Sequence, residues 1–272
     1  MQLVELQNAW RNLEQAGVAI FAISYDSSEV LAAFAEKRGI TYPLLSDQGS
    51  HTIHSLGLLN EQHLVEQHAF YGIQTRDEQR GVAYPGTFVL DERGIISEKH
   101  FEQSYRVRPT ARMFEEYALG ASKRTPPPAD APRASGGTLD VQVWTDAPTY
   151  RPFQQVRLHV DLSLPSGMHV FASPVPDGFT PLMLQVEPLD GLEVGPPALP
   201  AAQPFTVAGL DEHFVVYEDS IRAMIPLRFT KNLGSTAVTL RMEYQACTPT
   251  VCFRPTTLRV DLTLNGLDLI RD

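Results

Sequence analysis

The distribution of proline constrains the fold of this chain most strongly, because it separates two stretches of different character. Only Pro43, Pro85 and Pro109 precede residue 125, although the chain contains 21 prolines. The segment 121–137 is rich in proline, alanine and glycine and has no apolar periodicity, which is typical of a semi-extended linker. We therefore expect one domain over residues 1–120, a linker over 121–137 and a second domain over 138–272.

The first stretch alternates helix and strand patterns, which predicts an α/β layer with a buried sheet. Leu3, Leu6, Trp10 and Leu13 recur at helical spacing before Gly17. The apolar run 18–24 is typical of a strand buried on both faces. Asp26 and Glu29 resemble a capping box that opens a helix ending at Gly39. Further strands are expected over 42–45, 87–90 and 94–97, and further helices over 52–56 and 110–119.

The second stretch alternates apolar and polar residues along several short segments. The alternation is clear over residues 139–144, 156–162, 182–186, 237–242 and 258–262. Turn residues separate these segments at short intervals, and the proline-rich span 195–204 forms a long connection. This pattern predicts an all-β antiparallel sandwich.

Composition excludes several classes of function. The formal net charge is −10 and the isoelectric point lies near 5.3, whereas a nucleic-acid partner calls for a basic face. No apolar run reaches the roughly 18 residues of a membrane span, and residues 1–6 are typical of an amphipathic helix and not of a signal peptide. His51, His54, His63 and His68 have no cysteine or paired carboxylate nearby. We expect no metal site and no cofactor.

The two cysteines, Cys247 and Cys252, offer the clearest chemistry in the chain. The residues before Cys247 and after Cys252 are strand-like, so the four residues between them form a hairpin turn. This places the two Cα atoms about 4.5–5.5 Å apart, within reach of a disulfide. A disulfide that closes a loop this short stabilises a fold by only about 2 kcal/mol, whereas one that closes a loop of 100 residues contributes nearly 5 kcal/mol. The bridge is therefore a poor structural staple but an accessible exchange site, although a passive bridge or free thiols remain the alternative.

Three segments of the first stretch resemble redoxins, the thioredoxin-fold peroxiredoxins of the AhpC/TSA type. They are residues 22–27 (AISYDS), 42–47 (YPLLSD) and 84–94 (YPGTFVLDERG). The resemblance implies a thioredoxin-like fold and places Pro85 as the candidate for the cis-proline of such folds. The family's catalytic cysteine lies just before the first long helix, inside which this chain starts. We therefore expect a fold truncated at its N-terminus, without its first strand and active-site turn, and with one sheet edge bare.

The second stretch resembles the N-terminal domain of the thiol:disulfide interchange protein DsbD. The specific segment is 244–255 (YQACTPTVCFRP), with weaker support from 167–171 (GMHVF) and 211–214 (DEHF). The cysteine spacing departs slightly, because some members have five intervening residues. The resemblance implies an immunoglobulin-like β-sandwich with one redox-active cysteine pair.

This resemblance also implies roles for individual residues. Cys252 is the attacking sulfur and Cys247 the resolving one. Asp211 and Glu212 belong to a loop that caps the pair, Phe214 is the shielding aromatic residue, and Tyr217 is its substitute if the alignment shifts.

The function implied is that of a thiol-disulfide oxidoreductase with a thioredoxin-like protein partner in the periplasm or envelope. One alternative is a non-catalytic binding platform, in which a redoxin relic joins a sandwich with a passive disulfide. Another is an antioxidant peroxidase, which this chain cannot be by itself because the first stretch contains no cysteine.

Overall fold

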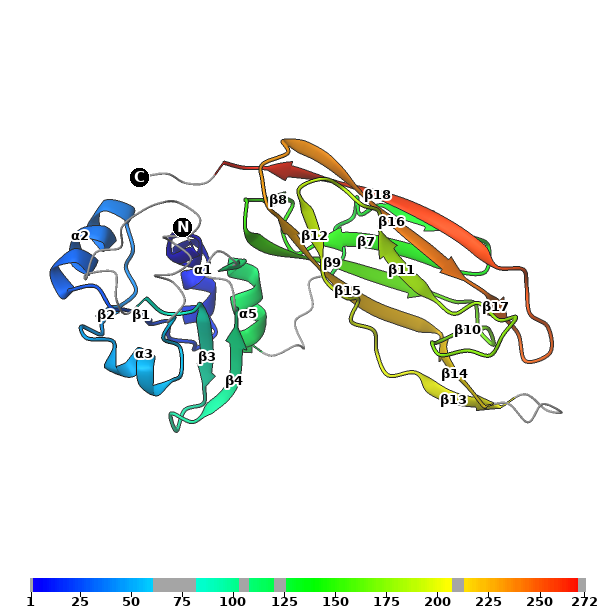
Figure 1. Cartoon of the computed structure of the whole chain (residues 1–272), viewed down its shortest axis with the longest axis horizontal. Coiled ribbons are helices and arrows are strands. Elements are labelled where there is room, and N and C mark those ends of the chain that lie inside the picture. Colours follow the sequence, from blue (N-terminus) through cyan, green and yellow to red (C-terminus); the bar gives the residue numbers. More distant parts are fainter. Residues whose placement is uncertain (1, 61–81, 103–107, 120–125, 207–212, 269–272) are drawn as a thin grey trace. The chain divides into compact units, whose positions relative to one another are not determined.

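The computed structural model describes residues 2–60, 82–102, 108–119, 126–206 and 213–268. The chain forms two compact units, which divide between residues 124 and 125 (Figure 1). The first contains the helices and short strands, and the second is built of strands. Each unit is described by itself.

The helices of the first unit end where the sequence pattern predicts. They are α1 (Gln2–Gln15), α2 (Ser28–Arg38), α3 (His51–Ser55) and α5 (Ala111–Leu119). Gly39 ends α2 in the left-handed region at φ 65°, a conformation that glycine adopts without a side-chain clash. The start of α2 differs from the prediction. Ser27, not Asp26, is the N-cap, and its hydroxyl accepts a hydrogen bond from the Val30 N–H at 3.4 Å.

Four of the described strands of this unit form two separate ladders, and the short strand β5 (Arg108–Pro109) belongs to neither. Strand β1 (Ala22–Ser24) pairs in parallel with β2 (Leu44–Ser46). Strand β3 (Gly86–Leu90) pairs antiparallel with β4 (Ile96–Phe101). The carboxylate of Asp91 closes the turn between them by accepting hydrogen bonds from the N–H groups of Arg93 and Ile95, both at 2.9 Å. The hairpin expected from the sequence is therefore present, but the described strands of this unit do not form one continuous buried sheet.

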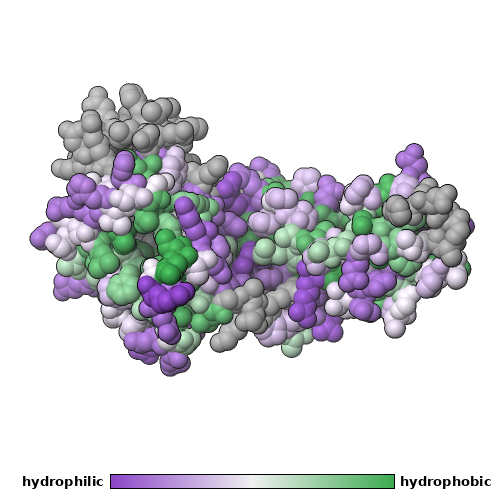
Figure 2. All heavy atoms as spheres, turned by 90° about the horizontal axis from the view of Figure 1, so that it is seen from below, coloured by the Kyte–Doolittle hydropathy of each residue, from purple (hydrophilic) through white to green (hydrophobic). Residues whose placement is uncertain are grey.

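The prediction that the run 18–24 is buried on both faces is wrong. Ile20 and Ala22 pack against the cluster of Leu6, Ile40 and Tyr42. Phe21 is 60% exposed and Ile23 48% exposed. Alternate side chains of a strand point to opposite faces, and among the described elements only one face of β1 is covered. Hydrophobic atoms accordingly gather on the surface of this unit (Figure 2), where Leu45, Leu90, Ile95, Ile96 and Phe101 are also exposed.

The second unit is a β-sandwich. One sheet has the strand order β12-β15-β9-β7-β6 and the facing sheet the order β11-β16-β18-β8. Their bounds are β6 (Arg133–Ser135), β7 (Asp140–Thr145), β8 (Thr149–Tyr150), β9 (Gln154–Ser163), β11 (Met183–Val186), β12 (Leu192–Val194), β15 (Ser220–Phe229), β16 (Ser235–Tyr244) and β18 (Thr256–Gly266). Strand β6 lies within the segment expected to be a linker, because residues 133–135 pair with β7.

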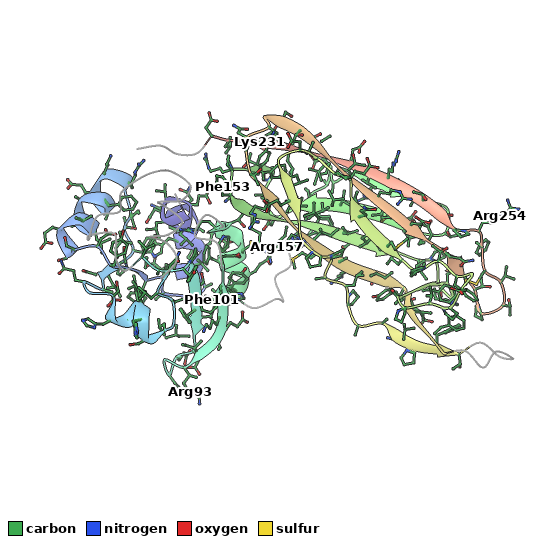
Figure 3. The ribbon with its side chains drawn as sticks, viewed as in Figure 1. Arg93, Phe101, Phe153, Arg157, Lys231 and Arg254 are labelled. Carbon is green, nitrogen blue, oxygen red and sulfur yellow. A yellow bond between two sulfur atoms is a disulfide. The ribbon has the colours of Figure 1, made fainter. Side chains whose placement is uncertain are left out.

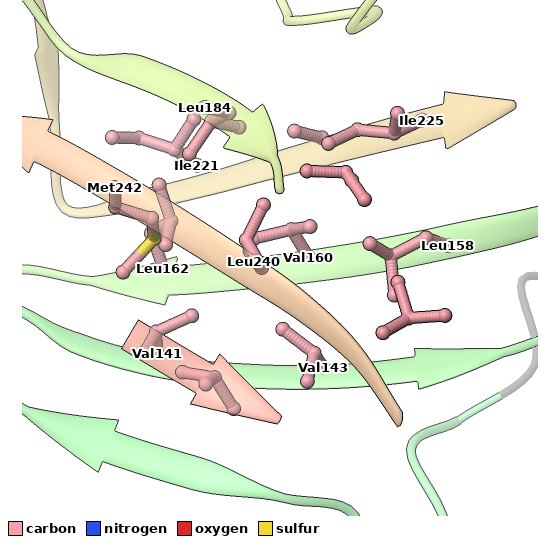
Figure 4. Packing of buried hydrophobic residues seen from close by; sticks show 14 of the residues in the cluster. Val141, Val143, Leu158, Val160, Leu162, Leu184, Ile221, Ile225, Leu240 and Met242 are labelled. Atoms are coloured by element: carbon pink, nitrogen blue, oxygen red, sulfur yellow. The ribbon is translucent and has the colours of Figure 1, made fainter. Parts of the chain in front are cut away.

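The core of the sandwich lies between these two sheets. Val160 of β9 and Leu240 of β16 are two of its fully buried residues (Figure 4). At one end of the core the ring of Phe229 stacks on that of Tyr150, with centroids 3.6 Å apart. The Tyr150 hydroxyl also accepts a hydrogen bond from the Leu233 N–H at 2.8 Å. Close packing of both inner faces gives this unit its stability.

Candidate redox site

Cys252 pairs through an isolated β-bridge with Cys247, which lies on a smaller third sheet with the order β13-β14-β10-β17. Its strands are β13 (Gln203–Thr206), β14 (His213–Glu218), β10 (His169–Phe171) and β17 (Ala246–Cys247). The two faces of this sheet have different neighbours. Val170 and Ala246 are cross-strand partners and belong to the main core. His169 and Cys247 are the next pair and lie on the opposite face, because alternate side chains change sides.

Cys247 and Cys252 form a disulfide, as the hairpin spacing predicts. The Sγ–Sγ distance is 1.99 Å and the Cα atoms are 4.0 Å apart. The Thr248 N–H donates to the Val251 carbonyl at 2.8 Å, and the Phe253 N–H donates to the Ala246 carbonyl at 2.9 Å. The cysteines therefore occupy the non-hydrogen-bonded position between two bonded pairs, where opposing Cα atoms come closest. This explains why their separation is slightly shorter than the expected one.

Side-chain hydrogen bonds hold the hairpin in place. The Thr248 hydroxyl accepts a hydrogen bond from the Val251 N–H at 3.0 Å. Gln245 is buried and makes two bonds: its Nε2 donates to the Phe253 carbonyl at 3.0 Å, and its Oε1 accepts from the Thr180 N–H at 3.1 Å. Gln245 thus ties the cysteine hairpin to the loop that contains Thr180. The sequence pattern shows Gln245 as part of a motif but does not reveal this role.

The two cysteines have very different surroundings. Cys247 is completely buried in a cluster with Phe171, Phe214 and Val216. The Phe214 ring lies 5.2 Å from that of Phe171 and 5.0 Å from that of Phe179, measured between centroids. We call this group, with the partly buried Val175, Phe179 and Phe205, the aromatic cluster. It surrounds one sulfur-bearing residue of the disulfide with apolar side chains.

Cys252, in contrast, is exposed, and so are its neighbours in the chain. Val251 is 56% exposed and Phe253 44% exposed. Arg254 projects into solvent from the end of the second unit (Figure 3). The disulfide therefore presents one residue to solvent and keeps the other inside, with apolar side chains beside the accessible one.

Two parts of the chain match the models of two different protein families. Residues 1–99 match the AhpC/TSA family, and residues 141–264 match the family "Thiol:disulfide interchange protein DsbD, N-terminal". The chain joins a redoxin-like region to a DsbD-like domain. The first has a thioredoxin-like fold, and the second is an immunoglobulin-like β-sandwich. The disulfide lies in the second of these two parts.

The curated relative of the redoxin-like region is the putative peroxiredoxin bcp of Coxiella burnetii (strain RSA 493 / Nine Mile phase I). It is 30% identical over 95 residues, which cover 34% of this chain and 53% of the relative. The chain thus spans about half the length of the curated relative it matches.

Solved structures similar to the chain include two bacterial domains. One is the N-terminal periplasmic domain of ScsB from Proteus mirabilis, with a TM-score of 0.35, 14% identity and 49% coverage of both chains. The other is the reduced DsbD N-terminal domain of Neisseria meningitidis, with a TM-score of 0.31, 18% identity and coverage of 52% of this chain and 92% of that one. At these sequence identities and TM-scores, residues of this chain are not matched one by one with residues of either domain.

The predicted capping residues have different positions in the DsbD-like domain. Phe214 lies in the aromatic cluster with Cys247. Tyr217 pairs with Val170 and packs against the main core, so it lies on the other face of the small sheet, and burial raises the pKa of its hydroxyl. Asp211 and Glu212 lie outside the described residues. Of the two aromatic candidates, only Phe214 is close to the cysteines.

Pro85 of the redoxin-like region does not have the expected cis peptide bond. In the part of the chain that the structure describes, the cis bond precedes Pro174. The bond before Pro85 is trans, and the Pro85 carbonyl accepts a hydrogen bond from the Glu102 N–H at 3.0 Å as the chain enters β3. The trans isomer is favoured before most prolines, and only the family resemblance pointed to cis.

His169 is a titratable residue of the site that the sequence did not predict. His169 is 3% exposed and is the cross-strand partner of Cys247. Its ring centroid lies 4.2 Å from that of Phe205 and 5.6 Å from that of Phe171. Burial lowers the pKa of His169 below its ordinary value, and the charge of Glu218 opposes this shift. In the sequence, residues 167–171 serve only as support for the family resemblance, and no signal there indicates the position of His169 opposite a cysteine.

The remaining histidines named in the sequence do not form a described site. His51 and His54 are exposed on α3, while His63 and His68 lie outside the described residues. Within the described ranges, no three metal-ligating side chains come together. None of the helices described here has the length and apolar character needed to cross a membrane.

Proposed function

We propose that this chain is a thiol-disulfide oxidoreductase that works through Cys252 and Cys247. The observation that carries the proposal is the asymmetry of the disulfide, with Cys252 exposed on a hairpin and Cys247 buried in the aromatic cluster. Exchange requires a thiolate to reach one sulfur in line with the bond that breaks. An exposed residue meets this requirement, and a second cysteine already positioned beside it can complete the exchange.

The exchange proceeds in two balanced steps. In the reduced protein, the Cys252 thiolate attacks a sulfur of a substrate disulfide, and a mixed disulfide forms while one substrate thiolate leaves. Cys247 then attacks Cys252 Sγ, restores the Cys247–Cys252 bond and releases the second substrate thiolate. Two electrons pass from the cysteine pair to the substrate. A partner dithiol returns these electrons by the reverse steps, in which its thiolate attacks Cys252 Sγ.

The proposed partner is a thioredoxin-like protein with a reactive dithiol. The exposed Val251 and Phe253 flank Cys252 and provide apolar surface against which such a partner can dock. The periplasm or another envelope space is the proposed compartment, which agrees with the periplasmic origin stated for the ScsB domain. The finer interpretation of the redoxin-like region, a thioredoxin fold without its first strand and active-site turn, stays a prediction.

Incubation of the oxidised chain with a reduced thioredoxin-like dithiol protein tests the proposal. Alkylation after acid quenching counts the free thiols by mass. We expect two alkylated cysteines after brief exposure to the partner and none without it. A disulfide that stays intact at high partner concentration, but is reduced in the unfolded chain, would contradict exchange and favour a passive bridge.

Removing the shielding ring should make the disulfide more reactive. Phe214→Ala opens the aromatic cluster beside Cys247, and we expect reduction by a small dithiol to become roughly tenfold faster, which corresponds to about 1.4 kcal/mol in the barrier. The matched control is Tyr217→Ala on the opposite face of the same strand, which should leave the rate unchanged. Equal acceleration in both variants would indicate general loosening of β14 and not shielding by Phe214.

A second candidate function, for the redoxin-like region, is that of a binding platform. Residues 1–246 contain no cysteine, and this favours a role in binding over one in catalysis for that region. Peroxide reduction in redoxins passes through a cysteine thiolate that becomes a sulfenic acid. We therefore expect no peroxide consumption by the chain with a thiol reductant above that of a Cys247→Ala, Cys252→Ala double variant. Fast turnover by the double variant would show a peroxide chemistry that uses neither sulfur.

A further inference from the structure

The small sheet brings one titratable side chain to the buried cysteine. His169 and Cys247 are directly opposed on β10 and β17 and lie on the same face. Directly opposed residues of an antiparallel pair have Cβ atoms about 4.5–5.5 Å apart, which brings a histidine ring within reach of a sulfur. His169 is also confined, because the rings of Phe171 and Phe205 contact it. His169 is therefore almost fully buried on the face of the small sheet that carries Cys247.

The chemistry of exchange creates a problem at this position. Cys247 is a thiol in the reduced protein, but it must become a thiolate to attack Cys252 Sγ. Burial among Phe171, Phe214 and Val216 disfavours the charged thiolate form of Cys247. A base beside Cys247 would remove the proton where water cannot. The second exchange step therefore depends on a proton acceptor in the aromatic cluster.

We propose that His169 is the proton acceptor for the Cys247 thiol when Cys247 resolves the mixed disulfide. This inference rests on the proposed function and adds a residue to it. Neutral imidazole takes the proton from Cys247 Sγ, and the sulfur attacks Cys252 Sγ. The Cys247–Cys252 bond forms, the bond between Cys252 and the substrate breaks, and the substrate leaves as a thiolate. In the reverse reaction the imidazolium returns the proton to the departing Cys247 sulfur.

The groups around His169 favour this role. Glu218 faces it from β14, Cys247 faces it from β17, and β13 contributes the uncharged ring of Phe205. Burial lowers the pKa of His169, so that at neutral pH the ring is neutral and can accept a proton. The charge of Glu218 stabilises the imidazolium that forms after the transfer. The resolving step should consequently slow as the pH falls through the pKa of His169, below about 6.5.

The test uses the reduced full chain and an aromatic disulfide whose thiolate absorbs visible light. The first absorbance phase reports attack by Cys252, and the second reports resolution by Cys247. We expect His169→Gln to slow the second phase roughly tenfold or more at neutral pH, because the neutral amide cannot take the proton from Cys247, and to leave the first phase unchanged. The substitution should also remove the decrease in the rate of the second phase at low pH. The matched control is His159→Gln, which changes another buried histidine that is stacked on Trp144.

The outcomes separate this inference from the proposed function. A normal first phase with an unchanged second phase in His169→Gln would overturn the role of His169 alone. Absence of the first phase in the unsubstituted chain would overturn both proposals. If His169→Gln does not fold, the unsubstituted protein still decides the question through nuclear magnetic resonance titration of the His169 ring. The ring pKa should differ between the oxidised and reduced forms, and identical titration curves would contradict coupling to Cys247.

Discussion

Cys252→Ala is expected to abolish exchange with a thioredoxin-like protein, and Cys247→Ala is expected to accumulate a mixed disulfide when it is mixed with the oxidised, disulfide form of that partner. The exposed residue makes the first bond to the partner, so without Cys252 no reaction begins. Without Cys247 the Cys252 thiolate still attacks the partner's disulfide, so that one partner sulfur leaves as a thiolate and a mixed disulfide forms, but this chain has no second thiol to resolve it. Non-reducing electrophoresis of each variant with the partner measures both results, and addition of a reductant should dissolve the accumulated complex.

Reversal of this pattern would be informative. If Cys252→Ala accumulated the complex and Cys247→Ala did not, the attacking sulfur would belong to the buried residue, and the partner would have to open the aromatic cluster first. If neither variant formed a complex, the disulfide would be a passive bridge. The double variant is the control, since it can form no disulfide with the partner.

Phe229→Ala is expected to lower the free energy of unfolding of the DsbD-like domain by about 3–5 kcal/mol, the usual cost of truncating a fully buried phenylalanine. Phe229 is completely buried and stacks on Tyr150 at 3.6 Å. The substitution removes this contact and leaves a cavity at the end of the core. Denaturant unfolding of the full chain, followed by a probe specific to the second unit, measures the change.

Phe253→Ala provides a matched control for this prediction. Phe253 is 44% exposed beside the cysteine hairpin, so its loss should change the free energy of unfolding by only about 0.5 kcal/mol. Similar destabilisation by the two substitutions would mean that the hairpin contributes to the core as much as β15 does. A small effect of Phe229→Ala would mean that the end of the core collapses around the missing ring.

The sequence predicted much of the fold because local patterns determine it. The alternation in β16 and β18 matches strands with one buried face, whereas in β7 and β9 residues of the other face, Trp144, Arg157 and His159, are buried as well. Strand β15 was missed, although Ile221, Ala223, Ile225 and Leu227 alternate along it. Pro226 lies in this strand, and a proline usually argues against a strand interior. In the redoxin-like region, the apolar run 18–24 did not reveal that one face of β1 is exposed, because neighbouring elements decide the burial of a strand.

The disulfide could be predicted because it depends on a short turn between strand-like residues. The position of His169 could not, because it depends on the pairing of β10 with β17, whose residues are far apart in the sequence. Phe214 and Tyr217 lie on different faces of the small sheet for a simpler reason. They are three residues apart on one strand and therefore point to opposite faces, and only the fold decides which face carries the cysteine.

The small sheet has a further consequence for how this protein can change over evolutionary time. One set of alternate residues, including Val170 and Ala246, completes the main core, while the intervening set, His169 and Cys247, surrounds the disulfide. Selection can therefore act on the two sets separately. Relatives could replace residues around the sulfur and acquire new exchange rates or new partners, while the sandwich keeps its melting temperature. A library of variants at His169, Phe171 and Phe214 would sample this freedom directly.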